Sequence, residues 1–268
     1  MKKGILLVVA LMLIAATAVA APVPSGSYYT DVIGGGIGSA PSGYYRNDDA
    51  YFGPYALGFT LNYFGNDYAN YYLNNNGNIS FEHGFSTFTP SPLNTTIVAP
   101  SIAPYWADVD TRPSNGGTVT VRTDIANQII VTWDQVGYYS NHTDRLASFQ
   151  LVLRGPDYVV PSDEGQIGFM YKTVGWETGD ASDGSGGFGG TEATVGFGDG
   201  LPAVNTGEIS LAGSQAPGIR GIVTNNHYWF NLGSGGTPET HDVPEPATML
   251  LLGLGLVGIA GIRRKFSN

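Results

Sequence analysis

Residues 71–81 read Tyr-Tyr-Leu-Asn-Asn-Asn-Gly-Asn-Ile-Ser-Phe, and this stretch indicates the fold class most directly. Two short apolar runs, 71–73 and 79–81, lie on either side of Asn76-Gly77. An Asn-Gly pair between two runs of β-forming residues is a strong signal for a turn, because both residues tolerate the positive φ angles that hairpin turns need. The stretch therefore predicts two paired antiparallel strands.

The same pattern continues along the chain in both directions. Residues 118–122 alternate in polarity, and residues 128–133 (QIIVTW) are β-branched with an aromatic end. Similar runs are found at 56–64, 149–153, 166–171, 193–197 and 227–232. No window predicts an amphipathic helix of three or more turns, and 39 Gly and 16 Pro provide many turns. We therefore predict an all-β fold, an antiparallel β-sandwich-like single domain.

Composition and charge exclude several classes of function. The 268-residue chain has no Cys, which excludes disulfides, thiolate zinc sites and iron–sulfur clusters. The stretch from Pro22 to Pro246 carries 7 basic and 22 acidic side chains, a net charge of −15. A body this acidic is repelled by phosphate backbones, so we expect no nucleic-acid partner.

The N-terminus has the three parts of a secretory signal peptide. Lys2 and Lys3 are followed by an apolar run over residues 5–16 and by Ala18-Val19-Ala20. A basic start, an apolar centre and a small-x-small cleavage site are typical of such leaders. We expect a signal helix over residues 1–20, cleavage directed by Ala18 and Ala20, and export of the chain.

The C-terminus has three parts in a fixed order. Val243-Pro244-Glu245-Pro246 precedes an uncharged apolar segment over 247–262, which ends at the basic cluster Arg263-Arg264-Lys265. These three parts, in this order, resemble the PEP-CTERM sorting signal of Gram-negative bacteria. The apolar segment predicts a transmembrane helix that holds the chain in the inner membrane, with the basic cluster on the cytoplasmic side. The resemblance implies that an exosortase recognises Pro244, Glu245 and Pro246 and that the processed protein reaches the cell surface or the exopolysaccharide matrix.

The body of the chain contains an ordered series of sequence blocks. The central block is Tyr105-Trp106-Ala107-Asp108-Val109-Asp110, and further blocks lie at 62–65, 71–77, 79–81, 130–136, 148–153 and 190–197. In this order the blocks resemble nidogen-like (NIDO) extracellular domains, whose aromatic-Trp-Ala-Asp-x-Asp pattern the central block matches. The resemblance implies an adhesive or structural role at the cell surface, with exopolysaccharide or other surface proteins as candidate partners.

These observations divide the chain into five parts. We expect a signal peptide (1–20), a linker (21–45), the nidogen-like β domain (46–232), a Gly/Ser/Pro linker (233–242) and the sorting signal (243–268).

The sequence gives no positive indication of catalysis, and we predict that the protein is not an enzyme. There is no G-x-S-x-G, and His83, His142, His227 and His241 are scattered without a recognisable metal spacing. The alternative is a secreted carbohydrate-binding or carbohydrate-active protein that uses acidic and aromatic residues. Among the aromatic residues we expect Trp106 and Trp133 in the core, and the pair Tyr138-Tyr139 at the surface.

Two places have the composition of a Ca²⁺ site, although we predict no cofactor. Asp108 and Asp110 project to the same side if the segment is extended, and could bind a cation. Arg112 continues the alternation and offers a simpler partner, an ion pair with Asp110. Residues 179–187 are also rich in Asp and Gly but lack the EF-hand spacing, so a plain surface loop is the competing interpretation.

Overall fold

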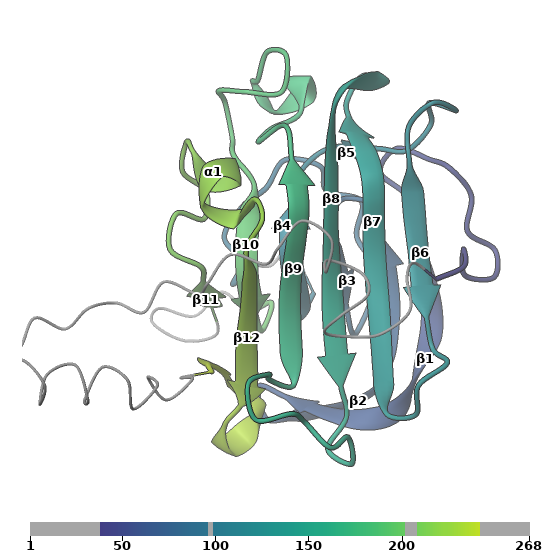
Figure 1. Cartoon of the computed structure of the whole chain (residues 1–268), viewed down its shortest axis with the longest axis vertical. Coiled ribbons are helices and arrows are strands. Elements are labelled where there is room, and N and C mark those ends of the chain that lie inside the picture. Colours follow the sequence, from purple (N-terminus) through teal and green to yellow (C-terminus); the bar gives the residue numbers. More distant parts are fainter. Residues whose placement is uncertain (1–37, 96–98, 202–207, 242–268) are drawn as a thin grey trace, which may run out of the picture.

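The computed structural model of the chain describes residues 38–95, 99–201 and 208–241, which form two packed antiparallel sheets (Figure 1). The first sheet has the order β1-β2-β3-β4-β10-β11, and the second has the order β13-β12-β9-β8-β7-β5, with β6 also paired to β7. Every strand pair is antiparallel. The predicted all-β antiparallel fold is therefore confirmed.

The strands of the first sheet are β1 (Tyr51–Tyr63), β2 (Asn66–Asn74), β3 (Asn78–Ser80), β4 (Ser101–Trp106), β10 (Thr194–Gly198) and β11 (Glu208–Ser210). Those of the second are β5 (Val109–Asp110), β6 (Thr118–Arg122), β7 (Gln128–Tyr138), β8 (His142–Arg154), β9 (Ile167–Val174), β12 (His227–Leu232) and β13 (Pro238–Thr240). The helical elements of the described residues are short: η1 (Asp180–Ser182), α1 (Ile219–Val223) and η2 (Ser234–Gly236).

The core lies between the sheets and consists largely of aromatic side chains. Trp133 of β7 stacks on Phe149 of β8, with ring centroids 5.2 Å apart, and Tyr105 of β4 reaches across from the other sheet to contact Phe149. Both Trp106 and Trp133 are fully buried, as predicted. Such ring pairs stabilise a core by about 0.5–1.5 kcal/mol each beyond the burial of their area. The domain is thus held by its apolar centre in the absence of disulfides.

Each run predicted as a strand overlaps a strand of the structure, and Asn76-Gly77 lies in the β2–β3 turn. Strand β4 was not predicted, because Pro104 interrupts it and Pro is rare inside sheets. The carbonyl oxygen of Pro104 instead accepts a hydrogen bond of 2.6 Å from the Tyr171 hydroxyl.

Parts of both expected linkers belong to the folded domain. Residues 234–236 form η2, and β13 pairs with β12. On the N-terminal side, Ser39 forms a bridge with Val121. The Gly and Ser content of these segments suggested flexibility, but their backbone groups find partners at the edges of the second sheet.

The expected signal helix and transmembrane helix lie outside the described residues. Among the residues that are described, no helix has the length and apolar character required to cross a membrane.

Candidate functional site

Three carboxylates gather at the end of the sandwich where β7 turns into β8. Asp48 and Asp49 lie just before β1, and Asp108 lies between β4 and β5. One carboxylate oxygen from each residue lies within 4.8 Å of the others. We call Asp48, Asp49 and Asp108 the acidic trio.

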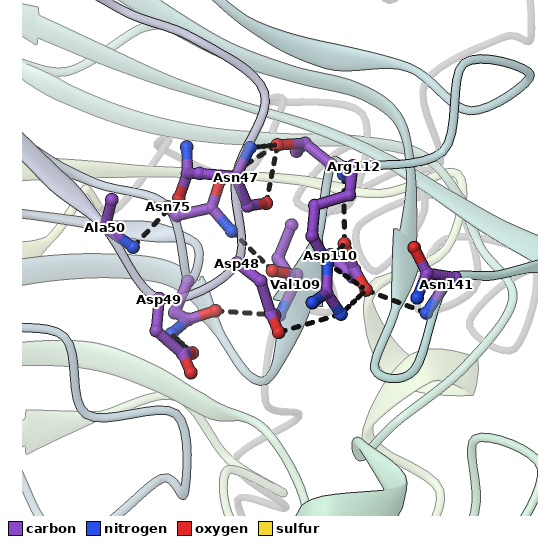
Figure 2. A network of polar contacts seen from close by, with 11 residues as sticks. Asn47, Asp48, Asp49, Ala50, Asn75, Val109, Asp110, Arg112 and Asn141 are labelled. Atoms are coloured by element: carbon purple, nitrogen blue, oxygen red, sulfur yellow. Dashed lines mark hydrogen bonds and ion pairs between the residues drawn. The ribbon is translucent and has the colours of Figure 1, made fainter.

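The segment that carries Asp48 and Asp49 is fixed by its neighbours. The amide of Ala50 donates a 2.9 Å hydrogen bond to Oδ1 of Asn47, which closes a turn around the two Asp residues (Figure 2). The main chain of Asn47 accepts from the Thr111 amide at 3.0 Å and from the Thr111 hydroxyl at 2.9 Å. This part of the trio is therefore tied to the strand end at β5.

The turn between β2 and β3 positions the trio from the other side. The side-chain amide of Asn76 donates to Oδ1 of Asp49 at 2.8 Å, and its oxygen accepts from the Val109 amide at 2.9 Å. Gly77 has φ +79°, and a Cβ there would lie 1.8 Å from the carbonyl oxygen of Tyr105. The turn that indicated the fold thus also supports the site, and only Gly fits at its third position.

Asp110, two residues after Asp108, is buried but fully partnered. It forms an ion pair with Arg112, with an Oδ2–Nη2 distance of 2.5 Å, and it accepts from the Asn141 amide at 2.7 Å (Figure 2). The Arg112 guanidinium also contacts Oδ2 of Asp48 at 2.9 Å. The predicted pairing of Arg112 with Asp110 is confirmed.

Asp108 is also buried but, unlike Asp110, has no partner in the described part of the chain. Its side chain is 1% exposed, and neither carboxylate oxygen has a hydrogen-bond partner among the described residues. Gly179 packs directly against it, since a Cβ on Gly179 would lie 2.3 Å from Oδ2 of Asp108. Desolvation, together with the neighbouring charges of Asp49, Asp48 and Asp110, raises the pKa of Asp108 to about 8, and Arg112 opposes the shift.

The other two members of the trio are perturbed in the same direction. Burial raises the pKa of Asp48 to about 7, helped by Asp49 and Asp110 and opposed by Arg112. The pKa of Asp49 is also raised by burial, while the hydrogen bond from Asn76 opposes the shift. The Oδ1 atom of Asp48 is buried and lacks a hydrogen-bond partner within the described part of the chain. All three groups therefore resist ionisation unless positive charge is supplied.

Asp108 and Asp110, which the sequence suggested as a shared Ca²⁺ site, have different surroundings in the structure. Asp108 and Asp110 do not form a common site, because Arg112 engages Asp110 and Asp108 faces Asp48 and Asp49. Sequence reasoning missed Asp48 and Asp49, whose only local signal was two adjacent Asp residues in a segment that contains several Tyr.

The loop at 179–187 brings no carboxylate to the trio. Asp180 lies beside His142, with an Oδ2–Nε2 distance of 3.5 Å, and its Oδ1 accepts from the Gly187 amide at 3.4 Å. Asp183 adopts a left-handed backbone at the end of η1. The loop contributes to the site through Gly179, whose lack of a side chain lets it lie against Asp108.

The aromatic residues correct one expectation. Tyr138 is buried, because it packs against Trp176 and stacks on His142 with ring centroids 4.6 Å apart, whereas Tyr139 is half-buried. The residues of the signal cleavage site and the sorting signal lie outside the described residues (Ala18, Ala20, Val243, Pro244, Glu245, Pro246, Arg263, Arg264 and Lys265).

A family model described as NIDO related matches residues 24–231. The match includes all three residues of the acidic trio and the strands of both sheets up to β12, and it leaves out β13. The chain belongs to the NIDO-related family. This family is of the structural or extracellular-matrix type and is not known for enzymes.

The chain is similar to much longer proteins that contain this domain. Alpha-tectorin of Mus musculus is 32% identical over 200 residues, which is 65% of this chain and 9% of the mouse protein. Alpha-tectorin of Homo sapiens is 31% identical over 204 residues, again 65% of this chain and 9% of the relative. Nidogen of Drosophila melanogaster is 29% identical over 118 residues, 35% of this chain and 9% of that protein. The matches therefore span about a tenth of each relative. No solved structure matches the chain.

A second family model, the PEP-CTERM protein-sorting motif, matches residues 242–265. This motif indicates a surface protein that an exosortase processes. The NIDO-related domain and the sorting motif are thus consecutive parts of one exported chain.

Proposed function

We propose that this protein displays its NIDO-related domain at the cell surface or in the exopolysaccharide matrix as a structural or adhesion module. The observation that carries the proposal is the order of the two matches, an extracellular-type domain over 24–231 followed directly by a sorting motif over 242–265. In this proposal the signal peptide exports the chain, and the apolar segment at 247–262 holds it in the inner membrane until an exosortase cuts near Pro-Glu-Pro.

The folded domain suits a role outside the cell. The stretch from Pro22 to Pro246, which contains the domain, carries a net charge of −15 that favours solubility, and the domain is stabilised by a buried aromatic core without disulfides. Domain boundaries near residues 46 and 232 remain part of this proposal, with η2 and β13 added to the domain at its C-terminal edge.

The sorting step is tested by comparing Glu245→Gln with Glu239→Gln. Both substitutions remove one carboxylate, but Glu239 is an exposed residue of β13 and Glu245 lies in the sorting motif. We expect Glu245→Gln to leave unprocessed chain in the inner membrane and Glu239→Gln to be processed normally, as read by membrane fractionation and by the mass of the surface-released protein. Normal processing of both variants would contradict the assigned role of Glu245.

The adhesive role is tested by deleting the gene and measuring flocculation and biofilm mass. We expect both to fall and to recover when the wild-type chain is restored but not when Glu245→Gln is supplied. Unchanged flocculation and biofilm mass would refute the adhesive role. Selective glycan-array binding by the exported protein, together with unchanged flocculation, would instead favour the alternative of a carbohydrate-binding protein.

A further inference from the structure

We propose that Asp48, Asp49 and Asp108 form a binding site for one divalent cation, Ca²⁺. The inference is independent of the surface role, because it rests on the geometry of the site alone. Its starting point is Asp108, a carboxylate that is 1% exposed and has no hydrogen-bond partner on either oxygen among the described residues. Buried charges in proteins are paired or bind metal ions, since an isolated buried carboxylate is strongly destabilising.

The nearby cation of the chain does not neutralise Asp108. Arg112 directs its guanidinium to Asp110 and Asp48, at 2.5 Å and 2.9 Å. Arg112 is shared between Asp110 and Asp48, so the trio and Asp110 together leave up to three uncompensated negative charges within a small volume. A divalent cation would compensate most of this charge.

The spacing and chemistry of the trio favour Ca²⁺. The three ligand oxygens lie within 4.8 Å of one another, and two oxygens that share a Ca²⁺ at about 2.3–2.6 Å can be at most about 5 Å apart. The donors are carboxylate oxygens, with no His or Cys in the group, which is the set that hard cations prefer. Mg²⁺ usually keeps several waters and takes one or two carboxylates, whereas Ca²⁺ accepts more carboxylates in irregular geometry.

Neighbouring groups hold the ligands in place before a cation binds. Asn76 fixes one oxygen of Asp49, Arg112 fixes one oxygen of Asp48, and Gly179 packs against Asp108. Oδ1 of Asp48 and both oxygens of Asp108 accept no hydrogen bond within the described ranges, so they are available as ligands. A preformed site of this kind binds without a large ordering cost.

The test uses the full chain, purified in mild detergent, freed of metal with chelator and titrated with CaCl₂ by calorimetry. We expect one Ca²⁺ per chain with a dissociation constant on the order of 10⁻⁴–10⁻³ M, the range of extracellular Ca²⁺ modules. At about 100 times that constant, Tm should rise by about 5–10 °C over its value in chelator. Asp108→Asn should bind at least about tenfold more weakly, and in chelator its Tm should equal or exceed that of the wild type, because the substitution removes a buried, unpartnered carboxyl group that lies beside further carboxylates.

Asp157→Asn is the matched control, since it removes an exposed carboxylate outside the trio and should keep wild-type Ca²⁺ affinity. Asp49→Asn provides a second trio variant if Asp108→Asn does not fold. The proposal is overturned if about 10 mM CaCl₂ changes neither heat nor Tm of the wild type, or if the trio variants bind as well as Asp157→Asn. An equal or larger response to MgCl₂ would overturn the assignment to Ca²⁺.

Discussion

The two ends of the sandwich each bury a charged side chain, and they treat it in opposite ways. Strand β8 joins them: it starts near the acidic trio and ends at Arg154, which is 0% exposed. Arg154 donates to Oε1 of Gln128 and to the Gly165 carbonyl, both at 2.9 Å, and it forms an ion pair with Glu164. Its guanidinium also lies between the rings of Tyr158 and Trp229, 4.5 Å and 4.7 Å from their centroids.

Asp108, by contrast, is 1% exposed and has none of these compensations among the residues that the structure describes. The difference indicates what kind of site each end is. A buried charge that the chain itself neutralises needs nothing from outside, whereas one that the chain surrounds with further carboxylates requires a proton or a bound cation. The Arg154 end is therefore structural, and the acidic trio is the end at which a ligand would act.

The largest loss of stability is expected at the end of the sandwich that contains Arg154. Arg154→Met should lower the free energy of unfolding by about 3–5 kcal/mol, because it leaves Glu164 buried without its partner. Urea denaturation measures the change. Arg145→Met is the control, since Arg145 is half-exposed and pairs with Asp144 at the surface; it should cost less than about 1 kcal/mol. Equal losses of stability in the two variants would show that the buried Arg154–Glu164 pair contributes no more than a surface ion pair.

The next effect concerns the turn that supports the trio. Gly77→Ala should destabilise the fold by about 2–4 kcal/mol, because its left-handed backbone disfavours a side chain and the new Cβ would overlap the Tyr105 carbonyl. Gly65→Ala has nearly the same φ angle, +80°, but no atom within 4 Å of the new Cβ. It should cost only about 1–2 kcal/mol. Thermal unfolding of the pair separates the steric overlap from the backbone preference, and no difference between them would mean that the close contact with Tyr105 is unimportant.

A smaller effect is expected in the pH dependence of stability with chelator present. The folded-state pKa values of Asp108 and Asp48, about 8 and about 7, lie above the unfolded value of 3.8. The folded state therefore holds more protons than the unfolded state, so the free energy of unfolding should fall as pH rises from about 4 to about 8. Asp108→Asn should make this fall shallower, because it removes one raised group and weakens the repulsion on Asp48 and Asp49. The groups that face Asp108 are Asp48, Asp49, Asp110 and Arg112.

Denaturant unfolding across this pH range provides the measurement, with Asp157→Asn as the control that should keep the wild-type slope. A wild-type stability that rises from pH 4 to pH 8 in chelator would contradict the raised pKa values.

The smallest effect is expected in the loop at 179–187, whose Asp and Gly content suggested a Ca²⁺ site. Asp180→Asn should change Ca²⁺ affinity by less than about twofold, because Asp180 contacts His142 and Gly187 and does not belong to the trio. Calorimetry would show this, and a loss comparable to that of Asp108→Asn would move the site to this loop.

The parts that could be predicted from the sequence are those set by local patterns. Asn76-Gly77 predicted its turn because the pair specifies a backbone conformation, and Arg112 could be matched to Asp110 because residues two apart share a side in an extended chain. The NIDO-related blocks were likewise readable from residue order.

The acidic trio could not be predicted in this way. Asp48 and Asp108 are far apart in the chain, and a bridge between Asp48 and Asp110 holds the two segments side by side. Burial of Asp108 depends on Gly179 of another loop, which no local pattern reports. The sequence pattern also did not predict β4, the strand that leads directly to Asp108, because Pro104 lies inside it.

If the unpartnered carboxylate of Asp108 is a cation ligand, a bound ion should be visible beside it. The most direct test is a crystal structure of the protein grown with CaCl₂, with an anomalous difference map to locate bound Ca²⁺. We expect one peak at about 2.3–2.6 Å from carboxylate oxygens of Asp48, Asp49 and Asp108. A map with no peak between these three residues, or with its peak in the loop at 179–187, would contradict it.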